Sequence, residues 1–556
     1  MKRNSEKLAD ELFDILVVGG GIIGAAIVHE ATERGFKSAL IEKGDFGQAT
    51  SANSLKTIHG GLRYLQQADL KRIRQSIRAR KKFMNFAPHL VLPQPFLIPV
   101  YGHGIKGKEA MAAALVMNDL LSWDRNQNLP EENFLPRGRL VSRKDCLNII
   151  PDIEKQGLTG GALWYDGQAQ HTERLTLEFI LAASEQGAIV ANYILAKDLL
   201  IKHGTVEGIK AEEVFSKSEF PIRAGMVINA SGPWLREVLK PLIQSPKLSM
   251  SWVKGINLII HKPLFQEYGV GLQENKKTTS GKGSRFFFFI PWHGQTMIGT
   301  AYNRYIGDPD LARLEEKEIT NFLEEINTIY PPARLTMNDV SFGHYGLQPL
   351  SEGQDENEAH PEPDRYSEIF DHESLAGMKG LISVKSTKYT TAPMVAEKVL
   401  GLVIAKGNLP VGPALQSAEL SPYKKTSLEE EIDKLAFKDQ AGSSSLLFDH
   451  FWQNYGPRTK KILELIRRNP EAPQLISRRP LVTIGEVLYG IREEMALKLS
   501  DMVCRRTDMA QAGCPTQESL QKVSEIMSKE LGWDETRRQR EIKEVIQFDL
   551  PFRKQV

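Results

Sequence analysis

The sequence predicts a multidomain α/β protein with a predominantly helical C-terminal domain. Three observations support this prediction. The chain has 556 residues, of which 41% are hydrophobic and 25% are charged, as is typical of globular proteins. A strand, a glycine-rich turn, a helix and a second strand follow one another near the N-terminus. After Pro422 the apolar residues recur at helical spacing almost to the end of the chain.

The N-terminal unit follows the order strand, turn, helix, strand. Residues 13–18 form an apolar run, and residues 19–24 read GGGIIG. Residues 22–34 have helical periodicity, and residues 38–42 form a second apolar run. A GxGxxG turn between a strand and a helix is the fingerprint of a βαβ unit that binds a dinucleotide. We therefore predict a dinucleotide site at this turn.

Four residues of this unit have separate predicted roles. Gly19 permits the tight turn, Gly21 lets the backbone approach a pyrophosphate, and Gly24 lets the helix pack closely on the strand. The N-terminus of the helix offers amide donors to that pyrophosphate. Glu42, at the end of the second strand, stands where an acidic residue binds the adenosine ribose. NAD and FAD both use this unit, so the motif alone does not choose between them.

Charge and cysteine content narrow the functional classes. Lysine and arginine number 71 against 69 acidic residues, a net charge of +2, so the whole chain has no electrostatic preference for nucleic acid. Its cysteines, Cys146, Cys504 and Cys514, are too few and too scattered for a disulfide framework or a zinc site, and they fit a reducing cytoplasm. No apolar run reaches the roughly 18 residues of a membrane span, and no signal-peptide pattern opens the chain. We expect a cytoplasmic protein, soluble or on a membrane surface, without a metal centre.

Residues 226–234 (MVINASGPW) bear on the choice of cofactor. They read as a strand that ends at Ala230, Ser231 and Gly232. This ending resembles the Ala-Thr-Gly turn by which flavoproteins of the glutathione reductase type return to the FAD domain. An ordinary strand-to-helix turn has the same appearance, so this segment favours FAD without excluding NAD.

Residues 50–64 (TSANSLKTIHGGLRY) carry the most specific similarity. They closely resemble the flavin-contacting loop of FAD-dependent glycerol-3-phosphate dehydrogenases, Thr-Ser-x-x-Ser-x-Lys-x-Ile-His-Gly-Gly-x-Arg-Tyr. The match runs for 15 residues at fixed spacing, so chance similarity is implausible. Further similarity covers most of the chain, at residues 186–193, 230–234, 289–292, 299–300, 305–309, 388–391, 484–499 and 505–507.

The resemblance implies a glutathione-reductase-type (Rossmann-like) FAD-binding domain, an antiparallel β substrate domain and a C-terminal all-α domain. Within the substrate domain, residues 284–292 and 295–301 are predicted to pair as antiparallel strands. The expected domain ranges are 13–95 for the first FAD-binding segment, 96–365 for the mixed substrate (cap) domain with FAD-domain segments returning near 160–250, 366–420 for the closing FAD-domain segment, and 421–556 for the helical domain.

The resemblance also implies a substrate site and an FAD site. A substrate alcohol must lose a hydride to the flavin and a proton to a base. His59 is a suitable base, Arg63 can hold an anionic group by a forked contact, and Tyr64 can donate to an oxygen. Lys388 can polarise the substrate oxygen or stabilise the reduced flavin, and the sequence does not decide whether His59 or Lys388 is the base. The residues assigned to FAD are Gly19, Gly21, Gly24, Glu42, Lys43, Thr50, Ser51, Ser54, Lys56, Gly60, Gly61, Ala230, Gly232 and Thr390.

The departures from the family pattern all fall on the substrate side. Gln348 stands where the family has a phosphate-binding arginine, Pro393 where it has a second arginine, and Asn257 where it has a histidine. Residues 171–175 read HTERL in place of Asp-Asp-Ala-Arg-Leu, and residues 299–302 read GTAY in place of Gly-Thr-Thr-Asp. Losing a forked arginine contact costs about 2–5 kcal/mol. The basic residues considered as replacements are Arg285, Arg304 and His344.

Three functions therefore stay open. The first is oxidation of glycerol 3-phosphate to dihydroxyacetone phosphate, with quinone as acceptor. The second is oxidation of another hydroxy or amine substrate, unphosphorylated, by an FAD enzyme of the same fold with quinone or oxygen as acceptor. The third is a flavin-binding partner protein without catalysis. The first is favoured by the extent of the resemblance, and the retained His59 and Lys388 argue against the third.

Residues 71–82 (KRIRQSIRARKK) read as a basic amphipathic helix. Its apolar stripe consists of Leu70, Ile73, Ile77 and Met84. Such a helix can expose its charges to water or lie on anionic lipid, and the residues alone favour water. Members of the family associate peripherally with membranes and pass electrons to quinone, so the resemblance leaves contact with the inner membrane face, and a homodimer, possible. No aromatic or groove-reading partners accompany the charges, so nucleic-acid binding is not expected.

Overall fold

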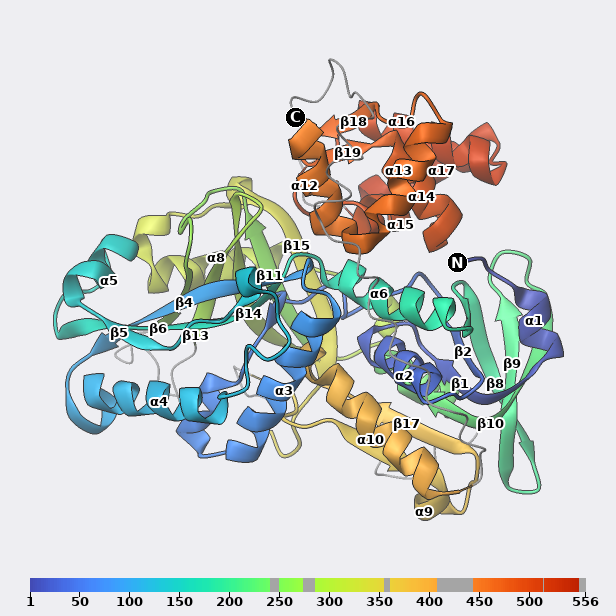
Figure 1. Ribbon diagram of the computed structural model, residues 1–556, viewed down its shortest axis with the longest axis horizontal. Helices are drawn as coiled ribbons and strands as arrows, with labels where there is room; N and C mark the ends of the chain where they lie inside the picture. Colours follow the sequence, from blue (N-terminus) through green and yellow to red (C-terminus); the bar gives the residue numbers. More distant parts are fainter. Residues whose placement is uncertain (241–249, 274–285, 355–360, 408–443, 514, 550–556) are drawn as a thin grey trace.

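The computed structural model describes residues 1–240, 250–273, 286–354, 361–407, 444–513 and 515–549. Within these ranges the chain forms two large sheets and a helical C-terminal domain (Figure 1). The C-terminal domain, orange to red in the figure, lies above both sheets. No helix in the described ranges is both long enough and apolar enough to span a bilayer.

The first sheet contains the predicted βαβ unit. Its central strand β1 (Leu12–Val18) pairs in parallel with β2 (Ser38–Ile41) on one side and β10 (Glu219–Asn229) on the other. The strand order is β16-β17-β10-β1-β2-β7, and β8 and β9 extend from β10 as an antiparallel pair. Residues 15–18 of β1 are all buried, which explains their continuous apolar run. The other strands are β7 (Ile189–Ala191), β8 (Ile194–Lys202), β9 (Thr205–Glu213), β16 (Glu368–Asp371) and β17 (Leu381–Lys385).

Helices cover one face of this sheet. α2 (Ile22–Glu33) packs between α6 (Thr172–Glu185) and α10 (Ala392–Ala405), and their apolar side chains form one core with the sheet (Figure 1). The opposite face packs against the β8–β9 pair, α1 (Ser5–Asp10) and α7 (Leu235–Val238). The sheet is thus built from segments that are far apart in the sequence, as expected for the FAD-binding domain.

The second sheet has the strand order β15-β11-β14-β13-β12-β4-β6-β3, with β5 beside β6. The predicted antiparallel pair is present as β13 (Phe286–Trp292) and β14 (Gln295–Tyr305); residues 284–285 of that prediction lie outside the described ranges. α5 (Arg143–Ile149) and α8 (Glu316–Ile329) pack on one face of the sheet. Its other strands are β3 (Thr57–Ile58), β4 (Val91–Tyr101), β5 (Arg139–Val141), β6 (Leu158–Ala169), β11 (Trp252–Ile260), β12 (Gly269–Gln273) and β15 (Val340–Pro349). Three further helices lie outside the two sheets: α3 (Leu70–Phe86), α4 (Lys108–Leu121) and α9 (His372–Ala376).

The C-terminal domain is mainly helical, as expected. It also contains a short antiparallel ribbon, β18 (Leu475–Arg478) and β19 (Leu481–Thr483), which the sequence analysis did not predict. The strands are only a few residues long, and too short to display a period of two. The helices are α12 (Ser444–Tyr455), α13 (Thr459–Arg468), α14 (Ile484–Glu494), α15 (Leu499–Asp501), α16 (Gln517–Leu531) and α17 (Glu535–Glu544).

Buried ion pairs attach this domain to the first sheet and its helices. Arg174 of α6 lies 2.8 Å from Glu494, and Arg458 lies 2.9 Å from Glu178 of α6. Asp45, which follows β2, accepts hydrogen bonds from both Arg505 and Arg506. Although burial alone would raise the pKa of Asp45, these two guanidinium groups lower it. The arginines therefore hold Asp45 ionised inside the interface.

The predicted basic helix is α3. Its apolar stripe is buried except at Leu70, but the expectation that its charges face water is wrong for Arg72 and Arg80, which are buried. Arg80 is buried against Asp166, and Arg72 is buried beneath Tyr64 and Tyr366. The other paired cations of the helix are Arg74 and Lys81, which both contact Asp124, and Lys82, which contacts Glu397.

Candidate active site

A cleft of about 2080 Å³ lies between the two sheets. Its lining includes Gly19, Gly21 and Glu42 of the βαβ unit. The same cleft reaches His59 and Lys388. One continuous space therefore joins the predicted dinucleotide site to the predicted substrate residues, as hydride transfer between them requires. The other predicted residues that line it are Lys43, Thr50, Ser51, Ser54, Gly61, Arg63, Tyr64, Ala230, Gly232 and Thr390.

The glycine turn is shaped by close backbone contacts. Gly19 has a positive φ of 111°, and a Cβ atom there would lie 2.6 Å from the Ala230 carbonyl oxygen. Gly24 does not line the cleft; a Cβ atom there would lie 1.9 Å from the Gly19 carbonyl oxygen. Gly24 therefore permits α2 to approach β1, while Gly21 is the residue that caps α2 beside the cleft.

The cleft fits the ADP half of FAD at this turn. Ser51 Oγ accepts a hydrogen bond from the Ile22 amide at 2.9 Å, and the N-terminus of α2 faces the cleft. Glu42 accepts from the amides of Gly20 and Gly44 at 2.7 and 2.8 Å, and burial raises the pKa of its carboxyl group. The N-terminus of α2 and the Glu42 carboxyl group suit a pyrophosphate and a ribose respectively.

Two further residues lie where the cleft opens. Gly232 has a φ of 58°, and a Cβ atom there would have no neighbour within 4 Å. Lys43 Nζ lies 2.6 Å from Asp310 and 4.0 Å from the centre of the Trp234 ring. Lys43 is therefore held by side chains of the cleft wall in this structure, and its assignment to FAD remains a prediction.

The loop formed by residues 50–64 crosses from the first sheet to the second. Thr50 Oγ1 donates to the Leu347 carbonyl at 2.9 Å. Two residues of this loop that were assigned to FAD do not line the cleft. Lys56 forms a fully buried ion pair with Glu173 at 2.9 Å, and the Gly60 amide donates to Asp166 at 2.5 Å. A buried ion pair fixes its partners in place. Lys56 and Gly60 therefore hold the shape of the loop and do not face the cleft.

The substrate end of the cleft is strongly cationic. Lys388 Nζ donates to the Tyr64 hydroxyl group, and the Arg72 guanidinium lies 4.0 Å from the centre of the Tyr64 ring. Arg63 and Arg365 also line this part of the wall. Burial, together with Arg72, Arg63 and Arg365, lowers the pKa of Lys388 to about 7. Such a concentration of positive charge is suited to binding an anion.

His59 lies at the edge of the same cluster. Burial, with the nearby charges of Lys388, Arg72 and Arg80, lowers its pKa to about 3. The imidazole is therefore neutral at physiological pH and can accept a proton. Its ring meets the Tyr64 ring edge to face at 5.9 Å between centres.

The positions that depart from the family pattern have separate environments. Gln348 and Asn257 line the cleft, and Asn257 Oδ1 accepts from the Thr300 hydroxyl at 2.7 Å. Pro393 is buried in the first turn of α10 and does not line the cleft. It starts a helix, which suits the fixed φ of proline.

Two of the three basic residues considered as replacements for the missing arginine do not line the cleft. His344 is fully buried, and Arg304 lies on β14; neither lines the cleft. Arg285 lies outside the described ranges. The cations found at the cleft instead include Arg72 and Arg365, which the sequence analysis missed. Arg72 belongs to the basic run of residues 71–82. Its place next to Ile73, a residue of the buried apolar stripe, was the sign in the sequence that its side chain could be buried.

Comparison with known proteins identifies the family. Residues 14–399 match the FAD dependent oxidoreductase family, and residues 425–538 match the C-terminal domain of alpha-glycerophosphate oxidase. The chain is 31% identical over 531 residues to glycerol-3-phosphate dehydrogenase of Synechocystis sp., covering 91% of each chain. It is 29% identical to the human mitochondrial glycerol-3-phosphate dehydrogenase, over 96% of this chain and 73% of the human one.

A solved structure supports the fold. The glycerol-3-phosphate dehydrogenase from Bacillus halodurans, solved in complex with FAD, superimposes with a TM-score of 0.74 at 24% identity, covering 98% of this chain and 96% of that one. The FAD-dependent fold, the cofactor and the enzyme class inferred from the sequence are therefore confirmed. The chain belongs to the FAD-dependent glycerol-3-phosphate dehydrogenase family of FAD-dependent oxidoreductases.

Proposed function

We propose that this protein oxidises glycerol 3-phosphate to dihydroxyacetone phosphate. The observation that carries the proposal is the group of four cations, Arg63, Arg72, Arg365 and Lys388, beside His59 on the cleft wall. A phosphate monoester carries about 1.5 to 2 negative charges near neutral pH, and guanidinium groups bind it by forked contacts. The names of the relatives in Synechocystis and humans support the same substrate.

Arg72 and Arg365 compensate for the arginine that Gln348 replaces. Arg72 is only 7% exposed; its guanidinium is stacked on Tyr64 and donates one hydrogen bond to the Arg365 carbonyl at 2.5 Å. Its position is therefore fixed before substrate arrives, which lowers the entropic cost of binding. Gln348 can still donate a hydrogen bond from its amide group to a phosphate oxygen.

His59 is proposed to remove the hydroxyl proton of the substrate. Bound FAD supplies the acceptor for the hydride. His59 is neutral at working pH, whereas Lys388, with a pKa of about 7, is partly protonated. Burial and, after it, neighbouring positive charges depress both pKa values. A phosphate dianion held by the arginines would offset those charges, making His59 a stronger base. Lys388 and Tyr64 then orient the substrate oxygen through their mutual hydrogen bond.

A dye-coupled dehydrogenase assay tests the substrate. The purified enzyme is supplied with glycerol 3-phosphate or with glycerol, and dihydroxyacetone phosphate is measured as product. The proposal requires turnover of the phosphorylated substrate, and a His59→Ala variant that binds FAD normally but loses most of that turnover. Faster oxidation of glycerol would contradict the proposal and favour an unphosphorylated hydroxy substrate, in keeping with the neutral Gln348.

Quinone is the proposed electron acceptor, at the cytoplasmic face of a membrane. Support comes from an exposed apolar surface on and beside α4, in which Val116 is 60%, Leu120 64% and Trp123 78% exposed. Exposed leucine on a helix face with an exposed tryptophan beside it is typical of peripheral insertion into lipid. This surface differs from the α3 charges, which are mostly paired within the protein.

Flotation with liposomes of anionic lipid tests this contact. The Leu120→Glu, Trp123→Ser double variant should stay at the bottom of the gradient, while the unsubstituted enzyme floats with the liposomes. Ile306→Ser, at an 89% exposed apolar residue outside this surface, is the matched control and should float normally. Equal flotation of all three proteins would contradict a role for α4.

A further inference from the structure

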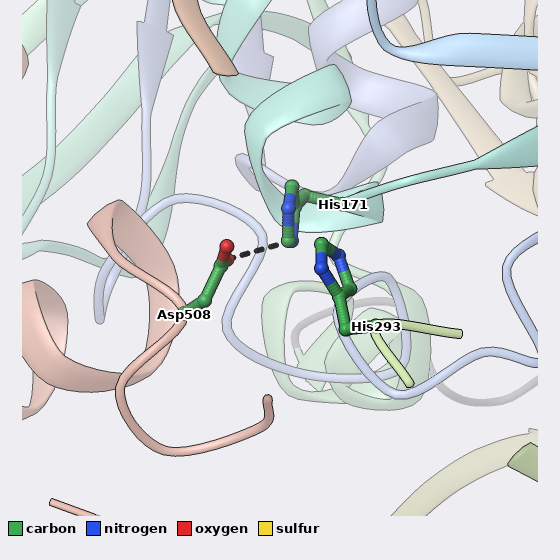
Figure 2. Close-up of side chains that lie close together, drawn as sticks. All are labelled: His171, His293 and Asp508. Carbon is green, nitrogen blue, oxygen red and sulfur yellow. Dashed lines mark ion pairs between the residues drawn. The ribbon is translucent and has the colours of Figure 1, made fainter. Parts of the chain in front are cut away.

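Two histidines and an aspartate from three distant segments meet at the edge of the C-terminal domain (Figure 2). His171 caps the N-terminus of α6, and His293 occupies the turn between β13 and β14. Asp508 follows the last turn of helix in residues 502–506. One ligand atom from each side chain lies within 4.8 Å of the other two.

His171 has no hydrogen-bond partner among the described residues. It is 1% exposed, and neither of its ring nitrogens makes a hydrogen bond. Its Nδ1 atom lies 2.9 Å from an Asp508 carboxylate oxygen, but without hydrogen-bond geometry. The His293 ring stacks on the His171 ring with 5.1 Å between centres. His171 Nδ1 is ion-paired with Asp508, but the buried Nε2 atom has no partner, which is costly unless another group occupies the space between these side chains.

We propose that His171, His293 and Asp508 bind a divalent transition metal of the zinc type. Two imidazole nitrogens and one carboxylate oxygen form a donor set that zinc favours, and a fourth position remains for water. Zinc bonds of about 2.0–2.2 Å place tetrahedral ligand atoms roughly 3.3–3.5 Å apart. Ligand atoms at the 4.8 Å limit would therefore need to close by roughly 1.4 Å, whereas His171 Nδ1 and the Asp508 carboxylate, at 2.9 Å, are already closer than this spacing. His293 is exposed, which gives the metal a path of entry from solvent.

The site would join three parts of the molecule. His171 belongs to the helix layer of the first sheet, His293 to the second sheet, and Asp508 to the C-terminal domain. Glu173 lies 3.6 Å from His171 and pairs with Lys56 in the loop of residues 50–64. A metal at this position would therefore stabilise the docking of the C-terminal domain and, through Glu173, the loop of residues 50–64. The scattered cysteines had predicted no zinc site, and no metal centre was expected.

Zinc titration of the holoenzyme tests the proposal. The protein is first treated with EDTA, and Zn²⁺ binding is then measured by isothermal titration calorimetry and by the shift in Tm. The expected result is one Zn²⁺ per chain, bound in the micromolar range or tighter, with Tm raised by a few degrees at saturation. His293→Ala should remove both effects without unfolding the protein, because His293 is at the surface. His103→Ala, at an exposed histidine paired with Glu109 elsewhere on the molecule, should change neither.

Cobalt provides a readout that does not depend on zinc affinity. Co²⁺ bound by the three ligands should give absorption bands at longer wavelengths than the flavin, with the intensity of a four-coordinate site. These bands should be lost in His293→Ala and in Asp508→Asn. The proposal is overturned if wild type and His293→Ala bind Zn²⁺ equally, if the wild type binds no Zn²⁺ at micromolar concentration, or if Co²⁺ remains six-coordinate.

Discussion

Arg72→Gln is the substitution that tests the arrangement of the substrate end most directly. Arg72 is buried, and its guanidinium is one of the group proposed to neutralise the substrate phosphate. Removing one partner of a buried charge pair costs about 2–5 kcal/mol, which corresponds to roughly a 30- to 4000-fold loss in kcat/KM for glycerol 3-phosphate. Most of the loss should be in KM, because the phosphate is remote from the reacting carbon.

The same substitution should alter the pH profile. After burial, Arg72 is the largest cause of the depressed pKa of Lys388, which is about 7. Removing a positive neighbour favours the protonated amine, so the pKa of Lys388 should rise. The high-pH limb of the pH–activity profile should then shift to higher pH. Arg72→Lys should recover part of the affinity but not the forked contact.

Steady-state kinetics with glycerol 3-phosphate and with glycerol measure both effects. Arg78→Gln, at an exposed residue of the same helix, controls for the loss of one charge from α3 and should retain wild-type kinetics. The reasoning is refuted if Arg72→Gln leaves KM for glycerol 3-phosphate unchanged, or if it reduces the oxidation of glycerol to the same extent.

Three further predictions follow from buried contacts. Gly24→Ala should lose FAD, measured as the flavin-to-protein absorbance ratio, because the new Cβ atom meets the Gly19 carbonyl at 1.9 Å; full occupancy would contradict this, and Gly401→Ala, with no neighbour within 4 Å, is the control. Asp45→Asn should lower the free energy of unfolding by about 3–5 kcal/mol in urea titrations, since it leaves two buried arginines without their shared carboxylate; an unchanged midpoint would contradict this. Despite burial, Lys56 and His171 lower the pKa of Glu173 from 4.5 to about 2, so its stabilising contribution is complete above pH 4.5 and lost as the pH falls toward 2. Urea midpoints of Glu173→Gln should therefore depend less on pH in that range than those of the wild type, and an equal dependence would contradict the assignment.

The glycine turn and the FAD fold could be predicted because their signals are local. Gly19, Gly21 and Gly24 are required by one turn and the helix that follows it, so their spacing is visible in a short segment. The loop of residues 50–64 was equally recognisable as a continuous motif. Its detailed contacts were not, because Lys56 and Gly60 meet Glu173 and Asp166, which are distant in the sequence.

The basic run of α3 shows why the cationic end of the cleft was missed. Helical periodicity identified the buried stripe, including Ile73 and Ile77, and assigned the charges to the opposite face. Arg72 and Arg80 lie next to that stripe, and their burial depends on Tyr64, Tyr366 and Asp166, which belong to other segments. Charge composition alone cannot distinguish such residues from solvated ones.

Anaerobic reduction of the bound flavin by glycerol 3-phosphate tests the central claim most directly. The visible absorption of the oxidised flavin should bleach rapidly when the substrate is added to the wild-type enzyme, and at most slowly in His59→Ala. The absence of bleaching in the wild type, with the flavin still reducible by dithionite, would contradict glycerol 3-phosphate as the substrate of this cleft.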